Sequence, residues 1–223
     1  MHQASNASFT PSHCSLPINR ALRIVAVVIA VLALAPALYS QSKTIIAVHL
    51  RTPEFVVHDV KYRVFFMKQE RKFIPLNDYD FSAALADELL TALSEDKRVA
   101  WRPADSKESE ALVPVFERKK DEGALPDSIK ADHVLLVDVF EYGAIVSSHP
   151  LIKDEFFINV SLKLVAPDTG KKLWSKRFFD RLKLPGKLAE LQADNQKGLK
   201  SGINTVLEQV SRKVKDKFKE AKV

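Results

Sequence analysis

An uncharged apolar segment near the amino terminus constrains this chain more than any other feature. Residues 24–42 carry no charge between Arg23 and Lys43, and the apolar core 24–38 leads into small residues at 35–40. A basic region, an apolar region and small residues suited to cleavage, in that order, are typical of a secretory signal peptide. We therefore predict a signal peptide over residues 1–40 and export of the rest of the chain.

An uncleaved membrane anchor over residues 24–42 is the alternative. A membrane-spanning helix needs about 20 apolar residues, whereas the apolar core here is shorter and contains Pro36. The sequence therefore favours cleavage, which predicts a periplasmic or secreted protein. If the leader is kept, the protein is instead anchored in the inner membrane.

The remaining residues, 41–223, are of a length that normally forms one domain with a complete core. Hydrophobic residues make up 46% of the chain and charged residues 28%, which is typical of a soluble globular domain. The single cysteine, Cys14, precedes the apolar core, so it leaves with the leader and is not placed for lipid attachment. We predict a single α/β envelope domain without disulfides.

The charge of the chain indicates which partners are plausible. Its formal net charge is +6, and removal of Arg20 and Arg23 with the leader leaves about +4, because residues 1–40 contain no acid. A mild positive excess, concentrated in the tail 212–219, suits an anionic membrane surface or a cell-wall polymer. Nucleic acid is not expected as a partner, since no basic stretch is interleaved with aromatic residues.

Strands are predicted from β-branched runs and from alternation of apolar and polar residues. The expected strands are 44–50, 56–67, 99–102, 132–142 and 155–165, and the segment 71–75 is expected to lead into a loop. Within 155–165, the even-numbered residues from Ile158 to Leu164 are apolar and the odd-numbered ones are polar, which predicts one buried and one wet face. Residues 167–170, Pro-Asp-Thr-Gly, predict a turn that returns 171–179 as the antiparallel partner.

Helices are predicted where apolar residues recur at helical spacing. The expected helices are 81–97, capped by Asp80 or Ser82, a kinked or divided helix over 106–120 with Pro114 inside it, and a long final helix over 187–219. Gly198 and Gly202 would allow the final helix a close approach to a neighbour. The predicted fold class is α/β: a single mixed sheet with amphipathic helices packed against it and a long C-terminal helix.

The final helix also carries the residues that we predict to bind a partner. They combine an apolar stripe with neighbouring lysines: Leu199, Ile203, Val206, Val210, Lys213, Lys215 and Lys217. The apolar stripe must pack against something, either the sheet of its own chain or another protein. A plain core helix explains the apolar members better than a partner surface does.

Patterns that indicate catalysis or cofactor binding are missing from the sequence. It contains no Gly-x-Ser-x-Gly elbow, no cysteine nucleophile after the leader, no histidine spacing for a helical metal site and no glycine-rich phosphate loop. We therefore predict no enzymatic activity, no cofactor and no metal. A hydrolase or ligand-binding protein remains an alternative, and it would need a deep pocket near His133, Asp138 and His149.

Two segments, Ala131–Asp138 and Phe157–Trp174, resemble a pattern of bacterial envelope proteins. In that pattern an Ala-Asp pair introduces an apolar strand, and a second strand ends in a Thr-Gly turn before its hairpin partner. The segments resemble the periplasmic domain of the curli-secretion lipoprotein family, the penicillin-binding-protein activator lipoproteins and the amino-terminal domain of the Tol-system propeller protein. The resemblance implies a small α/β domain that serves assembly or protein contact rather than catalysis.

Two departures from these families limit what the resemblance implies. No cysteine is placed for lipid attachment, and residues 143–154 are too few for the membrane-spanning hairpin of a secretion channel. The resemblance therefore implies the fold and the envelope setting, but not pore formation. We expect an exported, non-enzymatic protein that binds or helps to assemble another envelope component, with a membrane-tethered auxiliary subunit of an envelope transporter as the alternative.

Overall fold

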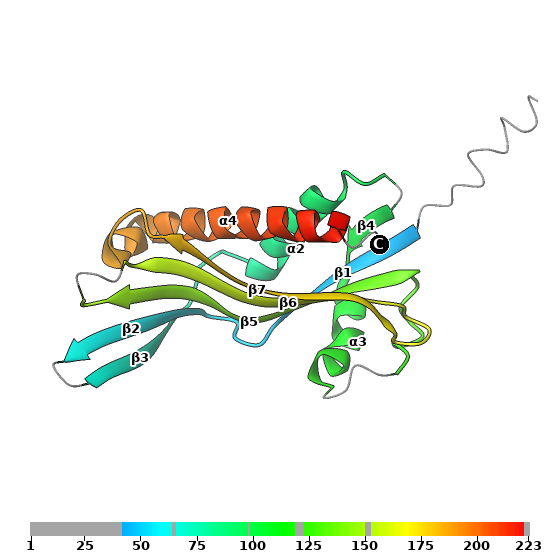
Figure 1. Cartoon of the computed structure of the whole chain (residues 1–223), viewed down its shortest axis with the longest axis horizontal. Coiled ribbons are helices and arrows are strands. Elements are labelled where there is room, and N and C mark those ends of the chain that lie inside the picture. Colours follow the sequence, from blue (N-terminus) through cyan, green and yellow to red (C-terminus); the bar gives the residue numbers. More distant parts are fainter. Residues whose placement is uncertain (1–41, 64–65, 98, 119–122, 150–152, 221–223) are drawn as a thin grey trace, which may run out of the picture. The chain divides into compact units, whose positions relative to one another are not determined.

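The computed structural model of the chain describes residues 42–63, 66–97, 99–118, 123–149 and 153–220 (Figure 1). The described strands are β1 (Ser42–Leu50), β2 (Phe55–Arg63), β3 (Phe66–Ile74), β4 (Val99–Pro103), β5 (His133–Ser147), β6 (Glu155–Val165) and β7 (Lys172–Lys183). The described helices are α2 (Phe81–Leu93), α3 (Ser106–Glu117) and α4 (Leu188–Glu220). All seven of these strands join one mixed sheet, which confirms the predicted α/β class. The predicted signal peptide, residues 1–40, lies outside the described residues, and so does the alternative anchor over 24–42 apart from Ser42.

Strand β5 organises the sheet, because it pairs with three other strands. On one edge, β1 pairs in parallel with the first half of β5 and β2 with the second half, while β6 pairs antiparallel along the other edge. The sheet is extended by β4 beside β1, by β3 beside β2 and by β7 beside β6. Strands β3, β4 and β7 are therefore the edges of the described sheet.

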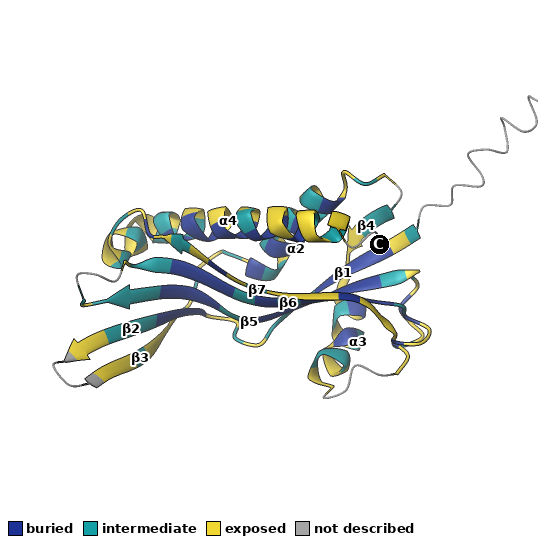
Figure 2. Ribbon diagram, in the orientation of Figure 1, coloured by how far each residue is buried: buried dark blue, intermediate teal, exposed yellow. Residues whose placement is uncertain are grey.

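Helices α2 and α4 cover one face of this sheet (Figure 1). The even-numbered residues of β6 point to that face and are at most 2% exposed from Phe156 to Leu164. Buried residues are concentrated there and on the sheet-facing side of α4 (Figure 2). Gly202 of α4 lies so close to β6 that any side chain at this position would overlap the ring of Phe156. The close approach predicted for Gly202 is thus confirmed, whereas a side chain at Gly198 would meet Leu191 of α4 itself and no neighbouring element.

Helix α3 packs on the opposite face, at the end of the sheet where β1 and β5 begin (Figure 1). A second, smaller core forms there from Ile45, Ala47, Leu112, Leu125, Ile129, Val134, Leu136 and Val165. A capping box starts the helix: the Asp105 carboxylate accepts from the Glu108 backbone N–H at 2.8 Å, and the Glu108 carboxylate accepts from the Asp105 N–H at 3.0 Å. Pro114 lies inside one continuous helix, so the predicted division into two pieces does not occur.

The β6–β7 hairpin and the start of helix α2 follow the predictions, but α2 ends at Leu93 instead of Lys97, and β7 continues past Phe179 to Lys183. Strand β6 has the predicted bounds, its partner β7 is antiparallel, and Gly170 has the positive φ of 66° that the turn requires. Asp80 is the N-cap of α2, accepting from the Ala83 N–H at 3.0 Å. Local sequence patterns were sufficient in these places.

Two strand predictions were wrong. Segment 56–67, expected as one strand, is divided between β2 and β3, and residues 71–74, expected near a loop, belong to β3. The residues between Arg63 and Phe66 include none of the Gly, Pro, Asn or Asp residues that indicate a hairpin turn. Strand β5 also extends past Tyr142 to Ser147 through Gly143, a residue type that is depleted in strands.

The final helix was predicted as continuous, but α4 is interrupted. Ala193 has a non-helical backbone conformation, and Asp194, Asn195 and Gln196 have φ values of 51°, 52° and 62°. The Gln196 side chain accepts from the Asn77 N–H at 3.1 Å and donates to the Pro75 carbonyl at 3.0 Å. These bonds from the loop before α2 hold Gln196, a residue type that rarely adopts the left-handed conformation by itself.

Candidate functional site

The sheet face opposite α2 and α4 is covered by α3 at one end only (Figure 1). We call the rest of this face the open face. Strand register places these side chains on it: His58, Arg71, Phe73, Asp138, Glu141, Glu155, Phe157, Asn159, Arg177, Phe179 and Arg181. Side-chain contacts with Asp138 and Arg177 add Arg51 and Phe140. Ring contacts agree with the register, because Phe157 lies 5.3 Å from His58 and 6.1 Å from Phe179 between ring centroids. In the described part of the chain, the open face is the largest stretch of sheet without a helix on it.

Arginine guanidinium groups lie over phenylalanine rings across the open face. The Cζ atoms of Arg51 and Arg177 lie 4.3 and 4.6 Å from the centroid of the Phe140 ring. The Cζ atom of Arg181 likewise lies 4.8 Å from the centroid of the Phe179 ring. Such cation–π pairs are worth about 0.5–1 kcal/mol where they are exposed, and they hold the flat guanidinium groups in defined positions.

Hydrogen bonds to polar side chains hold two of these arginines in position. Arg51 forms a forked pair with Asp138, with Nε 3.0 Å from Oδ1 and Nη2 2.6 Å from Oδ2. The hydrogen bonds to this carboxylate raise the pKa of Arg51 above its ordinary value. Arg177 Nε donates to Asn159 Oδ1 at 3.1 Å. A forked pair fixes direction as well as distance, so the open face presents ordered cations.

A second ion-pair cluster lies towards the β2–β3 hairpin. The Glu141 carboxylate accepts from Arg71 and lies 3.1 Å from His58 Nε2. Beside this cluster, Phe73 and Phe179 are each 51% exposed, although both are large apolar side chains. Exposed aromatic rings between ordered arginines are the composition that protein interfaces favour. Charged side chains whose only role is to prevent an edge strand from pairing with another chain would not need to be held in fixed positions, as these arginines are.

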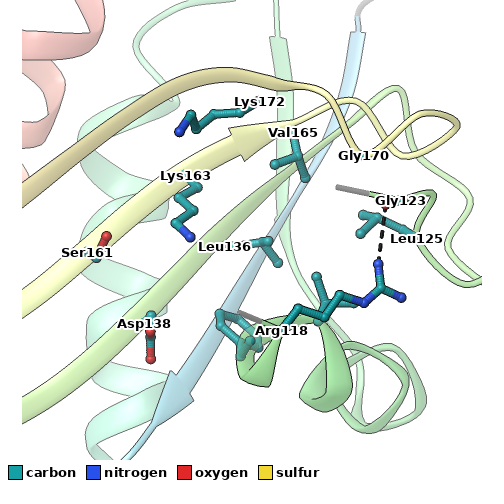
Figure 3. A pocket seen from close by; sticks show the side chains of 12 residues that line it. Arg118, Gly123, Leu125, Leu136, Asp138, Ser161, Lys163, Val165, Gly170 and Lys172 are labelled. Carbon is teal, nitrogen blue, oxygen red and sulfur yellow. Dashed lines mark hydrogen bonds between the residues drawn. The ribbon is translucent and has the colours of Figure 1, made fainter. Parts of the chain in front are cut away.

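A small pocket lies at the end of the open face, between α3 and the sheet (Figure 3). We call it the α3 pocket. Its lining residues are Val115, Phe116, Arg118, Gly123, Leu125, Leu136, Asp138, Ser161, Lys163, Val165, Gly170 and Lys172, and its cavity volume is about 40 Å³. The floor is apolar and buried, whereas the cationic side chains lie around the mouth.

The turn between β6 and β7 closes one end of the α3 pocket. Any side chain at Gly170 would overlap the backbone oxygen of Gly123, so the two segments are in direct contact. The Leu125 N–H also donates to the Pro167 carbonyl at 2.8 Å. On the other wall, Phe116 stacks on His49 with ring centroids 4.9 Å apart. The pocket walls are thus built into the fold.

The partner-binding residues predicted on the final helix divide into two groups. Leu199, Ile203, Val206 and Val210 are at most 4% exposed and pack against the sheet, so they are core residues in this structure. The lysines are ion-paired: Lys213 with Asp180, Lys215 with Glu95, and Lys217 with Glu220 at 2.7 Å. Of the seven predicted residues, only the three lysines reach the surface, and each of them is part of an ion pair.

The three residues of the hydrolase alternative lie in different places. His133 is 3.0 Å from the Ser42 hydroxyl, in a groove that also contains Trp101. Asp138 is on the open face, and His149 packs against the Tyr62 ring at a centroid distance of 5.0 Å. The structure therefore does not bring them together in one pocket.

Two further observations concern only the described residues. Among them, no group of three or more His, Cys, Asp and Glu side chains is arranged to hold a metal ion. No helix in the described ranges is long and apolar enough to cross a membrane.

Sequence reasoning missed the open face almost completely. The polar, odd-numbered face of β6 was predicted, but the arginines and phenylalanines of β7 and of the β2–β3 hairpin were not singled out. A usable signal was the alternation Arg177, Phe179, Arg181 on the same face as the polar residues of β6. It places cations and an aromatic ring where a solvated strand would carry small polar residues.

Comparisons with known proteins establish the fold but not a family. No family model matches the sequence, and no curated protein matches it. The structure is similar to protein XCC0632 from Xanthomonas campestris, of family-model DUF330, with 12% identity, a TM-score of 0.51 and coverage of 79% of this chain and 82% of that chain. It is also similar to hypothetical protein CT253 from Chlamydia trachomatis, with 9% identity, a TM-score of 0.52 and coverage of 80% and 96%.

A lipoprotein is also among the similar structures. Lipoprotein GNA1162 from Neisseria meningitidis shares 15% identity with a TM-score of 0.33, over 74% of this chain and 97% of that chain. Its TM-score is too low to support an argument about this protein. The first two similarities show a shared α/β fold, and none of the three shows membership of the families that the sequence resembles.

Proposed function

We propose that this protein is an exported, non-enzymatic component of the cell envelope that binds another envelope protein through the open face. The observation that carries the proposal is the set of ordered arginines around half-exposed Phe73 and Phe179. Export is supported by the apolar leader at residues 24–42.

The composition of the open face favours a protein partner over a lipid or polymer surface. Arginine and aromatic side chains dominate the energetics of protein interfaces because they combine large contact areas with several hydrogen-bond donors. The acids Asp138, Glu141 and Glu155 are interspersed among the arginines. A surface of mixed charge fits a partner with complementary groups better than it fits a uniformly anionic surface.

Site-specific cross-linking in cells tests the proposal. A photoreactive phenylalanine analogue is placed at Phe73 or Phe179 on the open face, and at Ser201 on the exposed side of α4 as a control. We expect the two open-face positions to capture the same envelope protein and Ser201 to capture none of it. Equal capture from all three positions, or capture from Ser201 alone, would contradict the proposal.

Affinity for the captured protein provides the quantitative test. The double variant Arg177→Gln/Arg181→Gln should weaken binding at least tenfold, which is about 1.4 kcal/mol. The control Lys176→Gln/Arg212→Gln makes the same charge change away from the open face. If both double variants weaken binding equally, net charge rather than the open face determines binding.

A further inference from the structure

We propose that the partner adds a strand to the exposed edge of β7, and that this added strand is acidic. In the described sheet, β7 pairs with β6 alone, so its other side is an edge (Figure 1). Extended segments bind to such edges through main-chain hydrogen bonds, and their alternate side chains provide the specificity. The inference rests on the proposed function only for the source of the strand, because the pairing itself can be measured with a synthetic peptide.

The register of the β6–β7 hairpin shows which backbone groups of β7 face the edge. Lys183 lies opposite Glu155, and the next residue, Leu184, donates its N–H to the Asp154 carbonyl at 2.9 Å. In an antiparallel pair, residues that bond directly across alternate with residues that do not. The even-numbered residues of β7 therefore bond to β6. The odd-numbered residues from 175 to 183 direct their N–H and C=O groups away from the sheet.

The residues that face the edge with their backbone also carry side chains of the open face. Arg177, Phe179 and Arg181 belong to both sets. A strand added at this edge would therefore place its own side chains directly beside these three. Its other side would run beside Phe178 and Leu182, which are half-buried against the core. The edge thus selects polar and apolar residues in alternation.

Strand β7 differs from the other two edges of the described sheet. Strand β4 is five residues long and ends in Pro103, which has no N–H to donate. In β3, Glu70 pairs with Lys61 and Lys68 at 2.7 and 2.8 Å, so its charges are satisfied close to its own hairpin. Residues 174–183 of β7 contain no proline and pair with β6 without a shift in register. This stretch can accept a strand along its whole length.

The charge along this edge selects an acidic strand. Arg177 donates to the neutral Asn159 side chain at 3.1 Å. It shares the neutral Phe140 ring with Arg51, whose own carboxylate partner is Asp138. Because the groups that hold Arg177 are neutral, its positive charge remains available for a carboxylate of the partner. Such a charge-assisted hydrogen bond is stronger than one between neutral groups.

Acidic residues outside the described ranges are too far along the chain to change this charge. They are Asp121 and Glu122, which directly precede Gly123. Gly123 contacts Gly170 in the turn before β7. From Gly170 to Arg177 the chain runs roughly 20 Å, at about 3.3 Å per residue of extended strand. The positive charge opposite the added strand is therefore set by the described residues.

A second copy of this chain is a poor occupant of the edge. If two β7 strands paired antiparallel about Phe179, Arg177 of each copy would lie opposite Arg181 of the other. Like charges directly opposite each other destabilise a strand pair. Cations on an edge prevent self-association in this way, but they attract an acidic strand. The strand that fits carries carboxylates opposite both arginines and an apolar side chain opposite Phe179.

A peptide with that pattern tests the pairing on the unaltered protein as recovered from cells. The probe is acetyl-Thr-Val-Glu-Val-Phe-Val-Glu-Val-Thr-amide, which reads the same in both directions and so fits a parallel or an antiparallel strand. We expect amide hydrogen exchange at the odd-numbered residues of β7 to slow at least tenfold at saturation, while exchange along the β3 edge stays unchanged. The matched peptide with glutamine at both glutamate positions should bind at least tenfold more weakly. Unchanged exchange in β7, or equal binding of the two peptides, would overturn the proposal.

Backbone methylation separates strand pairing from contact between side chains. Two versions of the peptide carry one N-methyl group, either on the central phenylalanine or on the valine before it. The two methyl groups block opposite edges of the peptide strand, because successive N–H groups of a strand point in opposite directions. We expect one version to bind at least tenfold more weakly and the other to keep its affinity. Equal loss or equal retention would contradict strand pairing.

The outcomes distinguish this inference from the proposed function. Capture of an envelope protein from Phe73 and Phe179, with no protection of β7 by the peptide, would overturn strand addition alone. Protection of β7 by the peptide, with no envelope protein captured, would overturn the proposed function alone. Protection of the same amides in the protein without peptide, decreasing on dilution, would assign the edge to a second copy and would also overturn the inference.

Discussion

The two faces of the sheet are made from the same strands but have different properties. On the covered face, the β6 side chains Phe156, Ile158 and Leu162 are at most 1% exposed beneath α4. On the open face, the same hairpin presents Phe179 at 51% exposure between ordered arginines. Because alternate residues of a strand point to opposite faces, one segment can contribute both to the stability of the core and to recognition. We therefore expect substitutions on the two faces to have separable effects.

The largest expected effect is on the covered face. Phe156→Ala should lower the free energy of unfolding by about 3–5 kcal/mol, because it leaves a cavity under α4. The residue that lies against the Phe156 ring is Gly202, which has no side chain to fill the cavity. Phe179→Ala, the same chemical change on the open face, should cost less than about 1 kcal/mol. Urea denaturation measures both. Similar losses for the two variants would remove the distinction between the faces.

The next effect tests how the β2–β3 hairpin is attached to β5. A side chain at Gly143 would overlap the Val56 carbonyl oxygen, so Gly143→Ala should destabilise the protein by about 1–3 kcal/mol. It should also raise the rate of amide hydrogen exchange more in β2 and β3 than in the other strands. Gly186→Ala is the matched control, since its side chain would meet only the flexible end of Glu190 at 3.1 Å. A neutral result for Gly143→Ala would mean that the hairpin can shift without cost.

A smaller effect concerns the start of α3. Glu108 caps the helix and pairs with Arg102 at 2.6 and 2.7 Å, and the hydrogen bonds to Arg102 hold its pKa below the ordinary value of 4.5. Glu108→Gln should therefore lose about 1–2 kcal/mol of stability at neutral pH. Glu110→Gln, on the same helix but exposed, should change little.

The pH dependence of that loss has a defined sign. A carboxyl group whose pKa is lower in the folded state contributes its full stability above the unfolded value of 4.5, and loses it as pH falls through the folded value. The difference between the unaltered protein and Glu108→Gln should therefore shrink in acid. Unfolding curves recorded from neutral pH downwards provide the measurement, and a difference that grows in acid would contradict this account.

The smallest effect on stability belongs to the open face. Arg177→Gln/Arg181→Gln should lower the free energy of unfolding by no more than about 1 kcal/mol per site, because each site loses one exposed cation–π contact and the exposed polar contacts beside it contribute little. The same variant is expected to weaken partner binding at least tenfold. Thermal unfolding and binding, measured on one preparation, test both statements. A loss of several kcal/mol would show that the arginines serve the core and not recognition.

Sequence patterns predicted the elements whose signals are local. The bounds of β6 and the turn at 167–170 were correct, and Asp80, one of the two caps predicted for α2, is the one that forms. In each case neighbouring residues are sufficient, because alternation, turn geometry and capping depend on a few consecutive side chains. The β2–β3 hairpin was not predicted, because its turn contains none of the residues that usually indicate a turn.

The candidate site was less predictable. The sequence predicted that the apolar stripe of α4 packs against another surface. It did not decide between the sheet of the same chain and a second protein. The structure shows that Leu199, Ile203, Val206 and Val210 pack on the sheet. Strand order then decided which side chains share the uncovered side, since Arg51, Phe140 and Arg177 come from distant parts of the chain.

By itself, the sequence determined the α/β class and the strands and helices whose signals are local, while the secretory leader over residues 1–40 stays a prediction. Those properties follow from hydrophobicity and spacing along the chain. Only the tertiary structure decided that α4 covers one face, that α3 covers only the end of the other, and that arginines from β7 and from the segment after β1 meet over Phe140. These facts depend on contacts between residues far apart in sequence, which no local pattern encodes.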